Sequence, residues 1–220
     1  MAEQIKESYQ QNGFYIHEAP VPDARLVLAA REGIDHIIAG DYDTGNPPDT
    51  SYWNPGDDPQ KMCKIEQPHK ANCAMAELIR SSDIGAIAAA ATGAEMVQVW
   101  WVQLLRKPVT PESEGARTNV GWHRDWTYHE PAWADNSNVF TAWIALNDLL
   151  EMSGPITFVQ GSHWWGETAE KGFFDQDIGE SSFAIPPGET RQDVPAMLQA
   201  GGLSLHHRLT LHASGPNNVS

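Results

Sequence analysis

Gly121-Trp122-His123-Arg124-Asp125-Trp126 is the stretch around which the fold of this chain is organised. In an extended strand, side chains two residues apart share a face, so His123 and Asp125 are expected to project together from one rigid support. A third ligand from a distant strand, for which His212 is the candidate, would complete two imidazoles and one carboxylate. That facial set leaves the opposite coordination positions open and suits non-haem Fe(II). A lone His-x-Asp is weak evidence in a chain with 9 His, so other motifs must converge on it.

The bulk composition predicts one globular domain. The chain has 220 residues, of which 41% are hydrophobic, which is enough for one substantial core. A formal net charge of -15 argues against nucleic acid and anionic membranes as partners. The sequence has no apolar run long enough to span a bilayer and no signal peptide at its start, so a cytoplasmic location is expected. Cys63 and Cys73 lie outside any CxxC spacing and are expected to be free thiols.

The first part of the chain, residues 1–93, is expected to form a helical flank. Helices are predicted over residues 3–11, 70–80 and 83–91, and a short strand over residues 14–16. The apolar spacing from residue 26 to residue 38 predicts an amphipathic helix, with Asp23 as its N-cap and Gly40 closing it. Residues 41–58 are rich in Gly, Pro, Asn and Asp, which predicts a loop.

From residue 94 onward the period changes from helix to strand. Strands are predicted over residues 96–105, 138–147, 156–159, 203–207 and 209–212. Turn residues 152–155 indicate a hairpin-like connection between the second and third of these strands. Residues 164–189 have weak periodicity, which predicts a long loop of the kind that forms functional lids. Short strands with Gly/Pro turns favour a β-sandwich or jelly roll over residues 94–220.

Several motifs occur in the order seen in phytanoyl-CoA dioxygenase-like proteins, which the chain resembles over nearly its whole length. They are Gln103-Leu104-Leu105-Arg106-Lys107-Pro108, Trp122-His123-Arg124-Asp125, Thr141 to Asp148, Ser153-Gly154-Pro155, Gly161-Ser162-His163 and His212-Ala213-Ser214-Gly215-Pro216-Asn217. Several motifs in register are far more specific than His-x-Asp alone.

The resemblance implies a mainly-β fold, a double-stranded β-helix (jelly roll) with N-terminal flanking helices. It also implies Fe(II) held by His123, Asp125 and His212, with 2-oxoglutarate as co-substrate beside Gln103 and Trp143. Ser214 is then expected to hydrogen-bond the far carboxylate of 2-oxoglutarate. The implied activity is hydroxylation of an unactivated C–H of a small or lipid-like molecule with O2. A carboxylate at position 125 favours hydroxylation, because related halogenases carry a small residue there.

One departure from the family pattern concerns the C-terminus. The Arg that pairs with the far carboxylate of 2-oxoglutarate in this family would lie just beyond Ser220, so the single domain 1–220 is expected to be C-terminally incomplete. An alternative is a catalytically impaired jelly-roll protein that binds metal or another ligand. A zinc-dependent hydrolase or isomerase is a weaker alternative, since two His and a carboxylate also suit zinc. The sequence does not indicate the oligomeric state.

Some side chains near these motifs have a second interpretation. His206 and His207 compete with His212 for the third ligand position but are expected to line the core or the pocket. Lys107 is expected to be a solvated side chain at a strand end. Gln103 is either a co-substrate contact or a satisfied interior polar group, and Trp143 suits ordinary core packing equally well.

Overall fold

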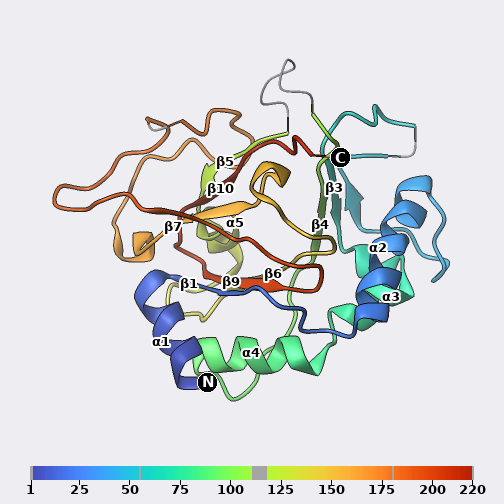
Figure 1. The fold of residues 1–220 in the computed structure, drawn as a ribbon, viewed down its shortest axis with the longest axis horizontal. Helices are drawn as coiled ribbons and strands as arrows, with labels where there is room; N and C mark the ends of the chain where they lie inside the picture. The colour runs from blue at the N-terminus through green and yellow to red at the C-terminus, as the bar shows by residue number, and fades with distance from the viewer. Residues whose placement is uncertain (1, 55, 111–117, 180, 220) are drawn as a thin grey trace.

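Two antiparallel β-sheets face each other at the centre of the computed structural model, which describes residues 2–54, 56–110, 118–179 and 181–219 (Figure 1). One sheet has the order β1 (Phe14–His17), β9 (Leu203–His207), β6 (Phe140–Ile144). The other has the order β5 (Val120–His123), β10 (His212–Ser214), β7 (Ile156–Val159), β8 (Asp193–Pro195). The rings of Phe14 and Phe158 stack across the interface with their centroids 4.8 Å apart. The expected mainly-β jelly roll is confirmed.

Strand β9 separates the helical side of its sheet from the side that faces the other sheet. Leu203 and Leu205 are buried in the hydrophobic cluster that includes the helices. Because side chains alternate along a strand, Ser204 and His206 point to the opposite face. That face looks toward Phe158 of the second sheet, whose ring centroid is 5.1 Å from that of His206. Ser204 and His206 therefore lie between the sheets.

Four helices cover the outer face of the first sheet and one edge of the molecule (Figure 1). They are α1 (Ala2–Asn12), α2 (Ala24–Ala39), α3 (Cys73–Leu78) and α4 (Ser82–Thr92). The predicted ends of α2 are confirmed, because Asp23 accepts a hydrogen bond from the backbone N–H of Arg25 at 2.8 Å and Gly40 adopts φ 79°. These helices bury Ile5, Ala30 and Leu78 in one cluster with β9. Their role is to support the first sheet.

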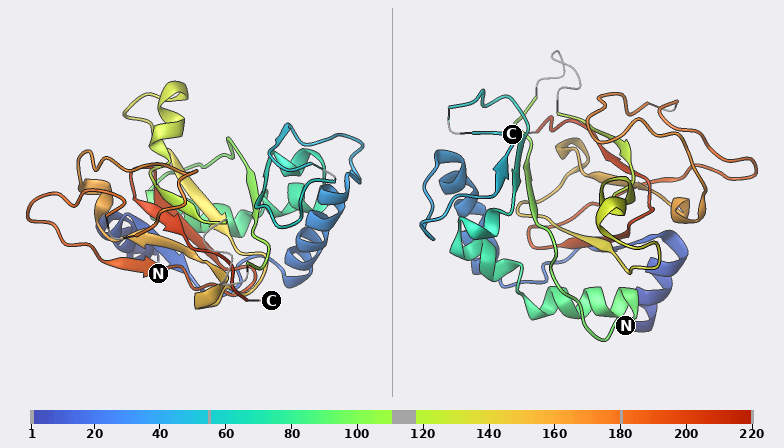
Figure 2. Two further views of the ribbon diagram at one scale, coloured as in Figure 1. Left: turned by 90° about the horizontal axis from the view of Figure 1, so that it is seen from above. Right: turned by 180° about the vertical axis from the view of Figure 1, so that it is seen from behind.

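The remaining elements are short. A third antiparallel sheet has the order β2 (Thr50–Ser51), β3 (Cys63–Glu66), β4 (Gln103–Arg106). Single turns of helix occur at Pro68–Lys70, α5 (Trp126–His129), Glu130–Ala132, Glu151–Ser153 and Ser162–Trp164. Residues 165–179 and 181–189 contain no helix or strand, as expected for the long loop. All views place this orange segment on the side of the molecule opposite α2 (Figures 1 and 2).

The expected strand over residues 96–105 is largely wrong. Only β4, from Gln103, is a strand, and the segment before it has no ladder partner among the described residues. Met96 is 84% exposed, so its apolar character does not reflect burial. The backbone of Val102 instead bonds Gln67, whose N–H donates to the Val102 carbonyl at 2.7 Å. Apolar composition predicted a strand that tertiary pairing does not extend.

The expected hairpin between residues 138–147 and 156–159 is also wrong. Strand β6 pairs with β9 in the first sheet, whereas β7 pairs with β10 and β8 in the second. The turn at residues 152–155 therefore carries the chain from one sheet to the other. The predicted strand over residues 209–212 begins only at His212, because the N–H of Thr210 closes a turn on the carbonyl of His207 at 2.8 Å.

Cys63 is buried and Cys73 is exposed, and both are free thiols as expected. Among the helices of the described residues, none is long and apolar enough to cross a membrane.

Candidate metal centre

His123 and His212 lie side by side on neighbouring strands of the second sheet. His123 is the last residue of β5 and His212 the first of β10, and their Cα atoms are directly paired in the antiparallel register. Their ring centroids are 4.1 Å apart. Outward-facing Trp122 and Ala213 are buried in a cluster under the long loop, so the alternate residues of both strands face inward.

Asp125 reaches the same point, but not as a strand residue. The strand ends at His123, and Asp125 has helical backbone angles, φ -60° and ψ -32°, as the residue that precedes α5. The expectation that His123 and Asp125 share one face of a strand is therefore wrong, although the two side chains do lie close together. A turn from strand to helix brings the carboxylate back beside the imidazole.

The three predicted ligands form one cluster. One ligand atom from each of His123, Asp125 and His212 lies within 4.8 Å of the other two. Asp125 Oδ1 is 3.8 Å from His123 Nε2 and 3.6 Å from His212 Nε2. Two atoms that share an ion with bonds of about 2.1 Å can be separated by up to about 4.2 Å, so these spacings fit a single cation.

Both imidazoles are held in the tautomer that a metal requires. The Nδ1–H of His123 donates to the carbonyl of Gly121 at 2.8 Å, and that of His212 donates to the carbonyl of Thr210 at 2.9 Å. Each bond leaves Nε2 without a proton and pointed toward Asp125.

The charges of the cluster also suit a cation. Burial, together with neighbouring imidazoles, lowers the pKa of His212 well below its usual value, and burial likewise lowers the pKa of His123. Burial alone would raise the pKa of Asp125, but His212, His206 and His123 lower it well below its usual value. At neutral pH the site therefore presents two neutral imidazoles and one carboxylate, which is the protonation state of a metal-binding site.

Two residues that sequence reasoning did not place at the centre contact Asp125. Thr141 Oγ1 donates to Asp125 Oδ2 at 2.5 Å, and His206 Nε2 lies 2.9 Å from the same oxygen. The signal for both was the alternation of β6 and β9, which puts Thr141 and His206 on the inner face. The expectation that His206 lines the pocket or core is consistent with this position.

The residues predicted beside 2-oxoglutarate occupy different surroundings. Trp143 packs between the sheets against the cluster of Phe14 and Phe158. Ser214 lies two residues beyond His212 on the same strand. Gln103 is exposed on β4, and its amide donates to Glu66 at 3.2 Å. Trp143 thus lies in the first sheet, Ser214 in the second sheet with His123 and His212, and Gln103 in the third sheet.

Lys107 is not the solvated side chain that the sequence suggested. Its ammonium donates to Ser214 Oγ at 2.6 Å and to the carbonyl of Gly215 at 2.5 Å. Burial lowers the pKa of Lys107 to about 7. The turn after β4 carries this side chain across to β10, a long-range contact that no local sequence pattern indicates. A cationic side chain therefore lies against Ser214.

The long loop returns over the triad of His123, Asp125 and His212. The backbone N–H of Gly121 donates to the carbonyl of Phe173 at 3.0 Å, and the Gly172 N–H donates to the carbonyl of Trp122 at 3.2 Å. These bonds seat the Phe173 ring edge-on to His123, with 5.2 Å between ring centroids. The loop therefore walls one side of the triad.

Replacing Gly121 by alanine is expected to destabilise the fold by about 1–3 kcal/mol. An added Cβ would lie 2.4 Å from the carbonyl oxygen of Gly172 and 2.7 Å from that of Asp175. Backbone atoms cannot relieve such a clash by changing rotamer. Urea unfolding would measure the loss. Gly166→Ala, in the long loop that packs on Gly121, is the control, because a Cβ at Gly166 meets nothing within 4 Å. Equal stability of both alanine variants would contradict the close packing of the loop on β5.

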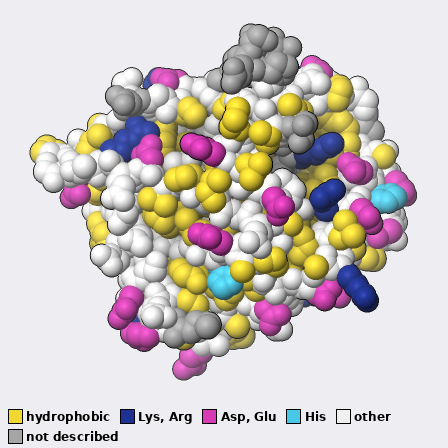
Figure 3. Space-filling model, in the orientation of Figure 1, with side chains coloured by type: hydrophobic (Ala, Val, Ile, Leu, Met, Phe, Trp, Pro, Cys, Tyr) yellow, Lys and Arg dark blue, Asp and Glu magenta, His cyan; other side chains and the backbone are white. Residues whose placement is uncertain are grey.

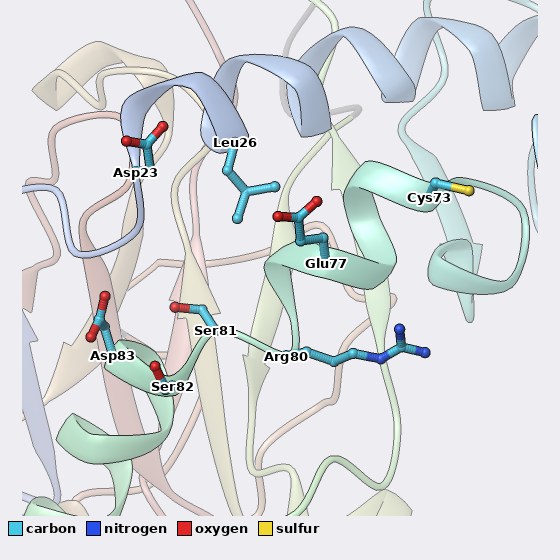
Figure 4. A pocket seen from close by; sticks show the side chains of 8 residues that line it. All are labelled: Asp23, Leu26, Cys73, Glu77, Arg80, Ser81, Ser82 and Asp83. Atoms are coloured by element: carbon cyan, nitrogen blue, oxygen red, sulfur yellow. The ribbon is translucent and has the colours of Figure 1, made fainter.

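A surface depression elsewhere on the molecule is separate from this centre (Figure 4). It is lined by Asp23, Leu26, Cys73, Glu77, Arg80, Ser81, Ser82 and Asp83. These residues come from the N-cap and first turn of α2, from α3, from the connection between α3 and α4, and from the start of α4. None of them is a predicted ligand of metal or co-substrate.

Comparison with known proteins identifies the family of this chain. The family model of phytanoyl-CoA dioxygenase matches residues 9–219. The chain belongs to the phytanoyl-CoA dioxygenase family. Within the curated proteins, it is 28% identical over 169 residues to a probable alpha-ketoglutarate-dependent hypophosphite dioxygenase of Stutzerimonas stutzeri, covering 74% of this chain and 54% of that protein. This phytanoyl-CoA dioxygenase family chain therefore spans about half the length of the curated relative that it matches.

Solved structures of similar fold support the architecture. The epimerase SnoN from nogalamycin biosynthesis, in complex with Fe3+, alpha ketoglutarate and nogalamycin RO, has a TM-score of 0.72 at 24% identity, covering 99% of this chain and 78% of that one. The alpha ketoglutarate dependent carbocyclase SnoK has a TM-score of 0.68 at 22% identity, covering 100% of this chain and 79% of that one. At these identities the likeness shows that the family member shares their fold.

Proposed function

We propose that the chain is an Fe(II)- and 2-oxoglutarate-dependent oxygenase that oxidises an unactivated C–H of a small molecule with O2. The observation that carries the proposal is the triad of His123, Asp125 and His212, whose ligand atoms lie within 4.8 Å of one another. Membership of the phytanoyl-CoA dioxygenase family supports the same chemistry.

The donor set fits ferrous iron. His123 and His212 would offer Nε2, and Asp125 would offer Oδ1, from the same side of the ion. Two imidazoles and a carboxylate with open positions form the facial site of non-haem Fe(II) oxygenases. When bound, the iron and its co-substrate supply the oxidising power for C–H cleavage, and the protein supplies positioning and exclusion of side reactions. The pairing of β5 with β10 and the wall formed by Phe173 provide that positioning.

Lys107 and Ser214 would hold the far carboxylate of 2-oxoglutarate. An ammonium and a hydroxyl 2.6 Å apart present two donors to one anion, and hydrogen bonds to charged groups are stronger than neutral ones. Lys107 now donates to backbone carbonyls, which a carboxylate would replace as the better acceptor. Trp143 would lie beside the co-substrate from the first sheet. Gln103, bonded to Glu66, is proposed only as a more distant contact.

The substrate is proposed to be a small molecule with a substantial apolar part. The inner wall beside His123 consists of the rings of Phe173 and Tyr128, with centroids 5.2 Å and 6.0 Å from that of the imidazole. Exposed aromatic side chains at Tyr52 and Phe174 continue this wall outward, with their rings 6.3 Å apart. Hydrophobic side chains are spread over the middle of the face in Figure 3, with acidic groups between them. Aromatic walls of this kind bind apolar groups best.

The test is anaerobic loading of the protein with Fe(II), followed by 2-oxoglutarate and O2, with succinate measured as the product. Iron-dependent succinate formation is expected even without substrate, as slow uncoupled turnover. The control is the same protein with zinc in place of iron, which cannot change oxidation state. If iron and zinc give the same background, the proposed function fails.

A further inference from the structure

We infer that Thr141 and His206 form a clamp that keeps Asp125 bound to the metal through one oxygen, Oδ1. This inference rests on the proposed function of the triad. It goes beyond that function because it assigns positioning roles to two residues that are not ligands.

The two oxygens of Asp125 have different surroundings. Oδ1 faces His123 Nε2 at 3.8 Å and His212 Nε2 at 3.6 Å, so it belongs to the metal side. Oδ2 accepts from Thr141 at 2.5 Å and lies 2.9 Å from His206 Nε2. Two donors occupy the lone pairs of Oδ2. They also prevent the carboxylate from rotating to bring Oδ2 toward a cation.

The clamp comes from strands that carry no metal ligand. Thr141 on β6 and His206 on β9 are directly paired in the antiparallel register, so their side chains stand together on the inner face of the first sheet. The ligand imidazoles belong to the second sheet. Asp125, on the loop between β5 and α5, is therefore fixed by contacts from both sheets of the sandwich.

The surroundings of His206 indicate that the polar atoms of its side chain serve to hydrogen-bond Asp125. The side chain is 1% exposed, and its ring lies against Phe158 and His212 at centroid distances of 5.1 Å and 4.4 Å. Among the described residues, its Nδ1 has no hydrogen-bond partner. The tautomer with the proton on Nε2 leaves a bare acceptor in this pocket and donates to Asp125 Oδ2. An apolar ring would fill the same space without an unpartnered nitrogen, so the donor is the feature that distinguishes histidine here.

Binding of Asp125 through one oxygen matters for the reaction, because a metal ion has a limited number of coordination positions. Of the roughly six positions around an octahedral ion, His123, His212 and one oxygen of Asp125 would take three. The remaining positions would then be open to the co-substrate and O2. A carboxylate that turned to bind through both oxygens would occupy one of these. The clamp therefore keeps the open face available.

The experiment compares two pairs of variants by Co(II) affinity and by 2-oxoglutarate affinity at saturating Co(II), both from calorimetry. Thr141→Val and His206→Phe remove the donors while keeping shape. Thr141→Ser and His206→Gln each restore an O–H or N–H donor. We expect the first pair to lose about 10- to 100-fold in Co(II) affinity. We also expect it to lose 2-oxoglutarate affinity, with the second pair close to the parent protein.

The outcomes separate the clamp from its premise. If the parent protein does not bind Co(II), the proposed function fails, and the clamp with it. If the parent binds and both Thr141→Val and His206→Phe bind Co(II) and 2-oxoglutarate equally well, the clamp is overturned while the function stands. A variant that loses thermal stability but keeps both affinities assigns that residue a structural role only. If His206→Phe does not fold, Thr141→Val and Thr141→Ser decide the question.

Discussion

Replacement of Asp125 by alanine is expected to reduce metal affinity by more than about 100-fold and to bring succinate formation to the iron-free background. Loss of a residue that only supports a ligand costs about 10- to 100-fold, so loss of the ligand itself costs more. Asp125 is also the one charged member of the triad, and without it two neutral imidazoles face the cation. Calorimetric titration with Co(II), beside the succinate assay with iron, measures both effects.

Asp177→Ala is the control for this prediction. Asp177 is an exposed carboxylate of the long loop, paired with Lys171 at 2.9 Å, and it does not contact the triad ligands. The Asp177→Ala variant loses the same negative charge as the Asp125 variant. Metal affinity that falls equally in both variants would assign the effect to net charge and would refute a discrete metal centre. Thermal unfolding in the absence of metal checks that the Asp125 variant is folded.

Replacement of Lys107 by methionine is expected to weaken 2-oxoglutarate binding by about 10- to 100-fold, the range for loss of one hydrogen bond to a charged group. Methionine keeps the length of the side chain and removes the ammonium that lies 2.6 Å from Ser214 Oγ. Metal affinity should remain that of the parent protein, because Lys107 does not contact the triad. Lys171→Met, at an exposed lysine of the long loop, is the matched control.

The same lysine predicts a pH dependence of co-substrate binding. Burial lowers the pKa of Lys107 to about 7, so above pH 7 the free protein holds a neutral amine. A bound carboxylate favours the ammonium, and binding above pH 7 then takes up a proton. Affinity for 2-oxoglutarate should therefore weaken as pH rises above 7, by up to about tenfold per pH unit.

Lys107→Arg tests the origin of this slope. Arginine stays protonated throughout this range, so the slope should be absent in Lys107→Arg as well as in Lys107→Met. A parent protein whose 2-oxoglutarate affinity is flat from pH 7 to pH 9 would contradict this predicted pH dependence. Measuring Co(II) affinity at each pH separates this effect from titration of the metal ligands.

The pattern of residues along the sequence determined much of this protein. The apolar spacing and end residues of α2, the short strands separated by Gly/Pro turns, and the family motifs around His123 and His212 predicted the helical flank, the jelly roll and the three ligands. The helix ends and the strand segments are local features, because a helix cap or a period of two depends on near neighbours, whereas the three ligands followed from the resemblance of the motifs to the family. The long loop after residue 164 followed from its composition in the same way.

Tertiary structure alone decided the features that depend on partners distant in the chain. Residues 96–102 have strand-forming composition but no neighbouring strand among the described residues, and β6 and β7 lie in different sheets because each found its partner elsewhere. Lys107 was expected in solvent, but the packing of β4 beside the sandwich turns it onto Ser214. Thr141 and His206 meet at Asp125 only when the two sheets close on each other. Local periodicity predicts the face of a strand or helix on which a side chain lies. The residues that it contacts there are set by strand pairing and sheet packing between segments far apart in the chain.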